Sequence, residues 1–220
     1  MPRDWSRLGA DRRGVAAVEL ALVAPLLLTM GLGTYEAAEV FRASMLVADA
    51  AQTIADLASQ QVGGVTDTTS GSLGNFCTAG KRVMTPFPTA GSSGNAGAFT
   101  AAIVSVTNNS GTAAVDWEAD SACSVSATAF ATSALSYATQ AIPNGTLPGC
   151  AQSGSTINLV PCSGDSVIVV HVTYHYNGPI QFVLPSLLGA IVLTETAYAR
   201  PRGGATITCA EPSTSNACPT

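Results

Sequence analysis

Charge is scarce in this sequence. Only 10% of the 220 residues are Asp, Glu, Lys or Arg, whereas 47% are hydrophobic, and the formal net charge is −5. A nucleic-acid-binding domain usually carries a clustered basic face, and an acidic chain with nine cations does not provide one. The length corresponds to one domain with an attached segment. The composition therefore argues against a nucleic-acid partner.

The sequence also lacks the short motifs of common enzyme active sites. It contains no G-x-S-x-G, no phosphate-binding glycine loop and no HExxH. Its two histidines, His171 and His175, lie four positions apart in a segment that reads as a strand, which separates them by ~13 Å and prevents them from sharing a metal ion. We therefore expect no enzymatic activity, no cofactor, no metal site and no small-molecule substrate.

The few cations are concentrated before a long apolar run. Those at the start are Arg3, Arg7, Arg12 and Arg13, and those further on are Arg42, Lys81, Arg82, Arg200 and Arg202. Residues 15–35 are apolar apart from Glu19 and two threonines, and a helix of that length matches the ~30 Å hydrocarbon core of a bilayer. The positive-inside rule then places the amino terminus in the cytoplasm and everything after residue 36 across the membrane.

A secretory signal peptide, cut near Ala38, is the alternative interpretation of this run. Glu19 argues against it, because a carboxylate at the centre of a spanning helix costs about 2.5–3.5 kcal/mol. Residues 36–61 also contain no Gly or Pro, and their apolar side chains recur at helical spacing. We expect one helix that leaves the membrane and continues as an amphipathic segment. Its apolar face is predicted to hold Phe41, Met45, Ala48, Ile54, Ala55 and Ala58, and its polar face Arg42, Asp49, Asp56 and Gln60.

A carboxylate inside the membrane needs a cationic partner, and the leading arginines all precede Gly14. Cleavage between Gly14 and Val15 would create one. The new α-amino group at Val15 would lie one helical turn from Glu19, and it would be positively charged at neutral pH.

Residues 12–39, RRGVAAVELALVAPLLLTMGLGTYEAAE, resemble the amino-terminal pattern of the TadE-like minor pilins, or pseudopilins, of the tight-adherence (Tad/Flp) type IV pilus system. Residues 167–202, VIVVHVTYHYNGPIQFVLPSLLGAIVLTETAYARPR, resemble that family's carboxy-terminal pattern. The resemblance covers 12–61 and 165–202 and leaves the middle uncovered. It implies a prepilin leader, 1–14, that a prepilin peptidase removes after Gly14, and it makes Glu19 the fifth mature residue.

The exported part shows several strand patterns and few helical ones. Residues 102–106 and 113–117 flank a Gly-containing connection and predict a hairpin. Asp116, Glu118 and Asp120 alternate along the second of these strands; they could bind a cation, but a solvated acidic edge that discourages aggregation is the interpretation we favour. Residues 61–98 are loop-like, and the alanine-rich stretch 127–140 is a helix candidate.

Residues 167–176 alternate and predict a half-buried strand, with the histidines on its polar side. The face expected in the core holds Ile168, Val170, Val172, Tyr174 and Tyr176. The apolar run 180–193 is too short to span a membrane, and we interpret it as a short core helix that leads into a strand over 191–200.

Together these patterns predict an α+β protein in four parts. They are a basic leader (1–14), a transmembrane helix (15–35), its amphipathic continuation (36–61) and an exported domain with a small antiparallel, pilin-like sheet and Gly/Ser/Thr-rich loops (62–220).

All six cysteines lie after the apolar run: Cys77, Cys123, Cys150, Cys162, Cys209 and Cys218. An even number in an exported domain indicates disulfides, and the spacing lacks the paired ligands of a zinc site. The pairs closest in sequence are Cys150–Cys162 and Cys209–Cys218, which would leave Cys77–Cys123, although other connectivities remain open. We expect these bridges to staple the domain.

Two functions follow from these features. The first is a minor pilin or pseudopilin of a Tad-type pilus for surface adherence, held in the bacterial inner membrane, with the prepilin peptidase, other pilins and the Tad assembly machinery as partners. The second is a single-pass anchored periplasmic binding or structural protein that is not part of a filament. Cleavage at Gly14 distinguishes them, because a plain anchor has no reason to be cut on the cytoplasmic side.

Overall fold

The structure, a computed structural model, describes residues 14–62, 64–66, 71–92, 95–109, 112–118, 164, 166–176, 178, 191–204 and 206–209. The expected leader cations, the helix candidate 127–140 and the core helix within 180–190 lie outside these residues. So do four of the cysteines, Cys123, Cys150, Cys162 and Cys218.

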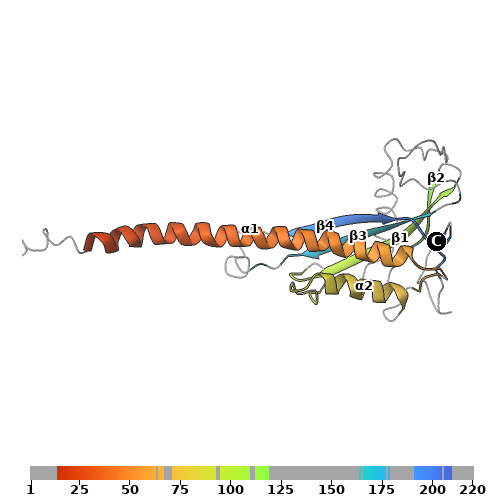
Figure 1. Cartoon of the computed structure of the whole chain (residues 1–220), viewed down its shortest axis with the longest axis horizontal. Coiled ribbons are helices and arrows are strands. Elements are labelled where there is room, and N and C mark those ends of the chain that lie inside the picture. Colours follow the sequence, from red (N-terminus) through yellow and green to blue (C-terminus); the bar gives the residue numbers. More distant parts are fainter. Residues whose placement is uncertain are drawn as a thin grey trace, which may run out of the picture.

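One long helix, α1, runs over Val15–Ser59 and is 45 residues long, which corresponds to ~67 Å. Figure 1 shows its amino-terminal part extending alone, away from the rest of the described fold. The apolar part of α1 is long and hydrophobic enough to cross a membrane, and none of that stretch is buried within the protein. Apolar side chains exposed on all sides of a helix call for a lipid or protein environment.

The sheet is antiparallel throughout and has four described strands. They are β1 (Phe99–Asn109), β2 (Thr112–Glu118), β3 (Ser166–His175) and β4 (Val192–Ala199), in the spatial order β2-β1-β3-β4. The predicted hairpin is β1 with β2, and the two carboxy-terminal strands lie where the sequence predicts them. The α+β class, with a long amino-terminal helix and a small antiparallel sheet, is confirmed.

The carboxy-terminal half of α1 lies along the sheet and contacts β3 and β4 (Figure 1). Its buried face is built mostly from alanine: Ala43, Val47, Ala50, Ala51, Ile54, Ala55 and Ala58. Small side chains let the helix backbone approach the sheet closely, so that the bulk of the core is supplied by β3. Ile168, Val170, Val172, Tyr174 and Tyr176 belong to this same cluster, as the alternation of the sequence predicted.

The prediction that this strand is half-buried is wrong for its first half. Residues 166–170 are buried without interruption, and alternation begins only at His171. The reason is a second apolar cluster on the other side of the sheet, made by Ala102, Val104, Val106, Val167 and Val169. A strand covered on both faces cannot show period-two burial.

The predicted apolar face of the amphipathic segment is also partly wrong. Ile54, Ala55 and Ala58 are buried, but Phe41 and Met45 are 71% and 62% exposed. Phe41 and Ile54 are 13 positions apart, which at ~100° per residue puts them on opposite sides of the helix. Three successive steps of three residues lead from Met45 to Ile54, but each step turns about 60° around the helix, so the series leaves the face on which it began.

A helix occupies part of the segment that the sequence predicted as loop. This helix, α2, runs over Ser72–Val83 and packs on α1. Its start is held by Thr66 and Ser72, since each backbone N–H donates to the hydroxyl of the other residue, at 2.8 and 3.0 Å. The buried residues Leu73, Phe76, Cys77 and Gly80 have helical spacing. Gly74 and Gly80 within the segment favoured the interpretation as a loop, because glycine is a poor helix former.

Gly80 shows why glycine stands inside α2. A Cβ added there would lie 2.5 Å from Cδ1 of Ile54 and 3.3 Å from the ring of Phe99. The missing side chain is therefore what allows α1, α2 and β1 to meet, and the residue that looks like a loop signal in sequence is a close contact in space.

Ile54→Ala should destabilise the folded domain by about 2–5 kcal/mol, because Ile54 is fully buried between α2 and the sheet and its removal leaves a cavity. Met45→Ala, a similar truncation at an exposed site on the same helix, should change the stability by less than about 0.5 kcal/mol. Denaturant unfolding of the detergent-solubilised chain, followed by tryptophan fluorescence, measures both. Equal losses for the two variants would contradict this assignment of the core.

Candidate functional site

The predicted cleavage site stands at the free end of α1. Gly14 is the N-cap of the helix, with no side-chain hydrogen bond capping it. Gly14, Val15 and Glu19 are all exposed, and a Cβ built on Gly14 meets nothing within 4 Å. The bond between Gly14 and Val15 is thus open to another protein, and the fold itself does not require glycine at position 14.

Glu19 lies in the first apolar turns of α1, surrounded by exposed Val18, Leu20 and Leu22. In a membrane these neighbours would face lipid or other helices, and the carboxylate would face the same environment. The four-residue spacing from Val15 holds in the structure, because the helix is continuous from Val15 onward. The cleavage and pairing roles of these residues stay predictions.

Among the described residues, Glu36 is the first buried residue of α1, and its side chain is 6% exposed. Residues 15–35 take up ~31 Å, about the thickness of the hydrocarbon core. The end of the described domain that lies nearest to residues 15–35 is therefore at the point where the span would emerge from the membrane.

Tyr176 and Gly178 receive Glu36 at this junction. The Glu36 carboxylate and the Tyr176 ring both lie beside Gly178, where an added Cβ would be 1.7 Å from Glu36 Oε1 and 2.6 Å from Tyr176 Cε1. Burial raises the pKa of Tyr176 to about 12, with further contributions from the negative charges of Glu36 and Glu39. Glycine at position 178 leaves the room that the carboxylate occupies.

The aromatic ring of Phe87 closes this part of the core. It lies 6.5 Å from the ring of Tyr174 and 6.0 Å from that of Tyr176, tilted against both. The Tyr174 hydroxyl donates to the carbonyl of Pro88 at 3.1 Å, and burial raises the Tyr174 pKa. The segment after α2 thus fixes both tyrosines.

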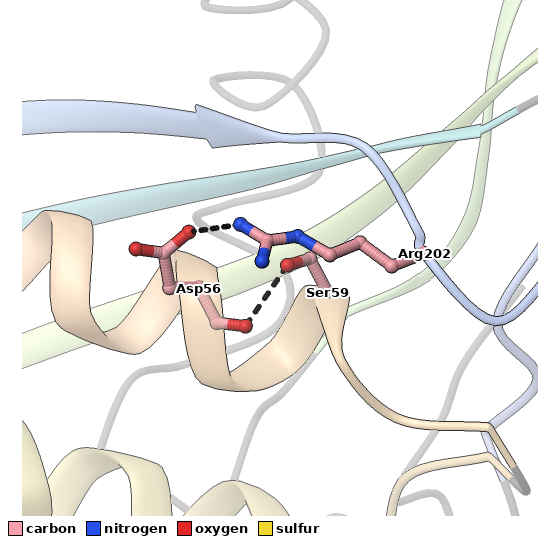
Figure 2. A network of polar contacts seen from close by, with 3 residues as sticks. All are labelled: Asp56, Ser59 and Arg202. Atoms are coloured by element: carbon pink, nitrogen blue, oxygen red, sulfur yellow. Dashed lines mark hydrogen bonds and ion pairs between the residues drawn. The ribbon is translucent and has the colours of Figure 1, made fainter.

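A second set of contacts holds the other end of α1, and Figure 2 shows two of them: the ion pair between Arg202 and Asp56, and the hydrogen bond that the Ser59 hydroxyl donates to the Asp56 carbonyl at 2.9 Å. The Arg202 guanidinium lies 3.1 Å from Asp56 Oδ1, and the Arg202 backbone N–H donates to the carbonyl of Ser59 at 2.8 Å. The ion pair is exposed and adds little by itself. Its place matters more, because it ties the segment after β4 to the last turn of α1.

Asp116 and Glu118 do not form the solvated edge that the sequence predicted, and Asp120, the third acid of that prediction, lies outside the described residues. The β1–β2 register shifts between Ser105 and Val106, so Asp116 is an extra residue in the pairing. Its carboxylate accepts hydrogen bonds from the hydroxyls of Ser105 and Thr107. Glu118 is only 4% exposed. β2 is an edge strand among the described strands, but Asp116 is hydrogen-bonded to β1 and Glu118 is buried, so neither forms a charged outer edge.

The histidines lie on β3 as the sequence indicated. His171 is half-buried, its Nδ1 lies 2.9 Å from the Thr196 hydroxyl on β4, and burial lowers its pKa. Within the described part of the chain, no three His, Cys, Asp or Glu side chains gather as metal ligands would.

Two of the six cysteines, Cys77 and Cys209, lie in the described residues, and neither is a free thiol. Cys77 is buried on α2. The backbone of Cys209 forms an isolated parallel β-bridge with that of Val65. Each pairing suggested by sequence proximity has at least one member outside the described residues, so the disulfide framework stays a prediction.

Sequence reasoning missed the junction at Glu36, Tyr176 and Gly178, and the Arg202 contacts. Nothing local marks Glu36 as buried, since it resembles any surface glutamate of a helix. The one available signal was the position of Glu36 just after the apolar run. That position does not tell a glutamate that faces the domain from one that faces water.

The family described as TadE-like protein matches residues 14–56. The match begins on Gly14 and ends inside α1, so it covers the apolar stretch and most of the segment that packs on the sheet. The resemblance to TadE-like proteins identified from the sequence is confirmed. A search of curated proteins finds no match to the chain, and a search of solved structures finds none.

Tyr176→Phe should remove a component near pH 12 from the tyrosinate absorbance titration of the chain. Because the raised pKa favours neutral Tyr176 in the fold, its contribution to stability is complete below about pH 10 and is lost as the pH rises toward 12. Tyr35→Phe, on the exposed side of α1, serves as the control and should retain the late component. Because burial also raises the Tyr174 pKa, the test is the amplitude: a late component as large as in the unsubstituted chain would contradict the raised pKa of Tyr176.

Proposed function

We propose that this chain, TadE-like over residues 14–56, is a minor pilin or pseudopilin that takes part in assembly of a Tad-type pilus. In this proposal α1 anchors it in the bacterial inner membrane, with the leader in the cytoplasm and the sheet domain in the periplasm. Its role is structural rather than enzymatic, and its partners are a prepilin peptidase, other pilins and the Tad assembly machinery.

The observation that carries the proposal is the coincidence at Gly14. The family match begins on Gly14, and the predicted cut falls between Gly14 and Val15. The comparison and the pattern of a basic leader before a glycine thus point to the same position. A plain membrane anchor would require the apolar helix but no marked residue at its start.

The exposed surface of α1 supports a role in assembly. Leu22, Leu26 and Met30 are each at least 60% exposed, so residues 15–35 of the helix are not packed against the described part of the domain. Helices in a membrane associate through packing and polar contacts, because lipid offers no hydrophobic drive between them. In the proposed assembly, a cleaved amine and Glu19 supply the polar contact that sets the position of neighbouring helices.

Disulfides belong to the same proposal, because the periplasm is an oxidising compartment. All six cysteines lie on the exported side of α1. Bridges would restrict the unfolded state of a Gly- and Ser-rich domain, where each is worth roughly 2–4 kcal/mol.

The first test is the cut. The chain extracted from membranes should start at Val15, as read by amino-terminal sequencing and intact mass, and each disulfide should lower that mass by two hydrogens. Gly14→Leu should block cleavage without disturbing the fold, because a side chain at Gly14 meets nothing. A start at Met1 would leave a plain anchor, and a start near Glu39 would indicate a secreted protein that has lost its span.

The second test is Glu19→Ala. Membrane insertion should be kept or improved, because the substitution removes a charge from an apolar helix. Incorporation into pili should fall strongly, since the partner of the Val15 amine is gone. Glu19→Gln keeps the shape and should fail in the same way, whereas Leu20→Ala, an exposed neighbour on another side of the helix, should assemble normally. Pili that contain the Glu19→Ala chain at the normal level would exclude the proposed pairing. Immunoblots of membrane and sheared-pilus fractions give both readouts.

A further inference from the structure

One end of the sheet domain lies beside the last residues of the apolar stretch, where α1 leaves the described fold (Figure 1). Glu36 and Tyr176 both border Gly178 there, and the Tyr176 backbone N–H donates to the carbonyl of Ile191 at 2.9 Å. The end of β3 and the start of β4 are therefore level with Glu36, one residue beyond the stretch 15–35.

The segment between α2 and β1 reaches the same end of the domain. The Gly97 backbone N–H donates to the carbonyl of His175 at 2.8 Å, and the His175 backbone N–H donates to the carbonyl of Ala98 at 2.9 Å. The ring of Phe87 lies 6.0 Å from that of Tyr176. Two parts of the chain that are far apart in the sequence thus form one surface beside the span.

We call this surface the proximal end of the domain. It consists of the described residues from 85 to 98 and of those next to the end of β3 and the start of β4, where the strand register pairs Val192 with His175. The side chains that it exposes are small and uncharged. They include Pro88, Ala90, Ser92, Asn95, Ala96 and Val192.

Charge is nearly absent from the described residues of the proximal end. Residues 83–115 and 176–194 contain no Asp, Glu, Lys or Arg, although the whole chain has fourteen acids and nine cations. On α1 at this level, Glu36 is buried, and Glu39 lies 4.0 Å from Arg42 in an ion pair. An acidic chain therefore presents an uncharged surface on the side that is nearest to the span.

The proximal end falls within the headgroup layer of a bilayer that α1 crosses. The headgroup layer adds about 5–8 Å on each side of the hydrocarbon core, and Glu36 is only ~1.5 Å beyond the stretch that matches this core. At that depth carboxylates would be repelled by anionic lipids, and any charge would lose part of its water. An uncharged surface avoids both costs.

We propose that the proximal end rests in the lipid headgroup layer and is a second membrane contact of the domain, in addition to α1. Lipid is the occupant because this surface continues the one that residues 15–35 present to the bilayer. The contact fixes the angle of α1 in the membrane, since the domain is packed on α1 and tilting would lift or sink the proximal end. The inference requires that residues 15–35 cross a bilayer, but it requires neither cleavage nor a pilus.

Quenching of an introduced tryptophan by nitroxide-headgroup lipids tests this contact. The full chain carrying Val192→Trp is reconstituted into phosphatidylcholine vesicles, with Trp5→Phe in every variant, so that buried Trp117 gives the background. Quenching should be several-fold stronger than in the chain without Val192→Trp, and the emission should shift to the blue. Ala96→Trp should behave in the same way.

Gln52→Trp is the matched control, because Gln52 is exposed on α1 but ~26 Å beyond Tyr35. It should stay at background. If Val192→Trp and Ala96→Trp are quenched no more than Gln52→Trp in chains that resist carbonate extraction, the proximal end stands in water and the proposal is wrong. Chains that carbonate releases do not span the bilayer, which would also refute it.

Lipid charge and protein density separate this contact from its alternatives. Added phosphatidylglycerol or salt should leave the quenching of Val192→Trp unchanged, because the surface has no net charge to screen; a strong dependence would indicate electrostatic docking and contradict the proposal. Quenching that falls as the chains are packed more densely would show that protein covers this end instead. A chain that starts at Met1 would remove the pilin function and leave this contact standing.

Discussion

The structure depends on one helix that must satisfy two solvents. Residues 15–35 of α1 are almost entirely apolar and exposed, which suits a helix surrounded by lipid. Above Glu36, α1 has to offer one side to its own sheet and remain compatible with water or protein on the other. Because α1 is a single uninterrupted helix over Val15–Ser59, its two parts are rigidly joined. A contact that positions one end of the helix therefore also positions the other.

At Glu36 the helix passes from its exposed apolar stretch to the part that packs on the sheet, and the neighbours of Glu36 fit a buried carboxylate. Tyr176 supplies a hydroxyl for the carboxylate, and Gly178 supplies space. A carboxylate that is buried against the domain makes the end of the span unambiguous, because the charge cannot slide into hydrocarbon without breaking its contact. The alanine-rich face above it then allows close approach between α1 and the sheet, with the bulk provided by β3.

Elements whose side chains face a single environment were predictable from the sequence. The span, the hairpin of β1 and β2, and the core face of β3 each follow from a period that a single environment imposes. The TadE-like start was likewise predictable, because arginines, glycine and Glu19 lie next to one another. Prediction failed where two partners share an element: β3 is covered on both sides over 166–170, and α1 has separate apolar sides for Ile54 and for Phe41. It failed again for α2, where glycine serves close packing rather than a turn.

The contact between Arg202 and Asp56 joins residues 146 positions apart, and nearby Trp117 Nε1 donates to the carbonyl of Ile207 at 2.7 Å. Both contacts lie at the far end of the domain and use residues near the end of the chain. During synthesis α1 is made before the residues that its last turn contacts. The domain therefore cannot complete its fold until β3, β4 and the segment after them have been made, and the alanine face of α1 stays uncovered until then.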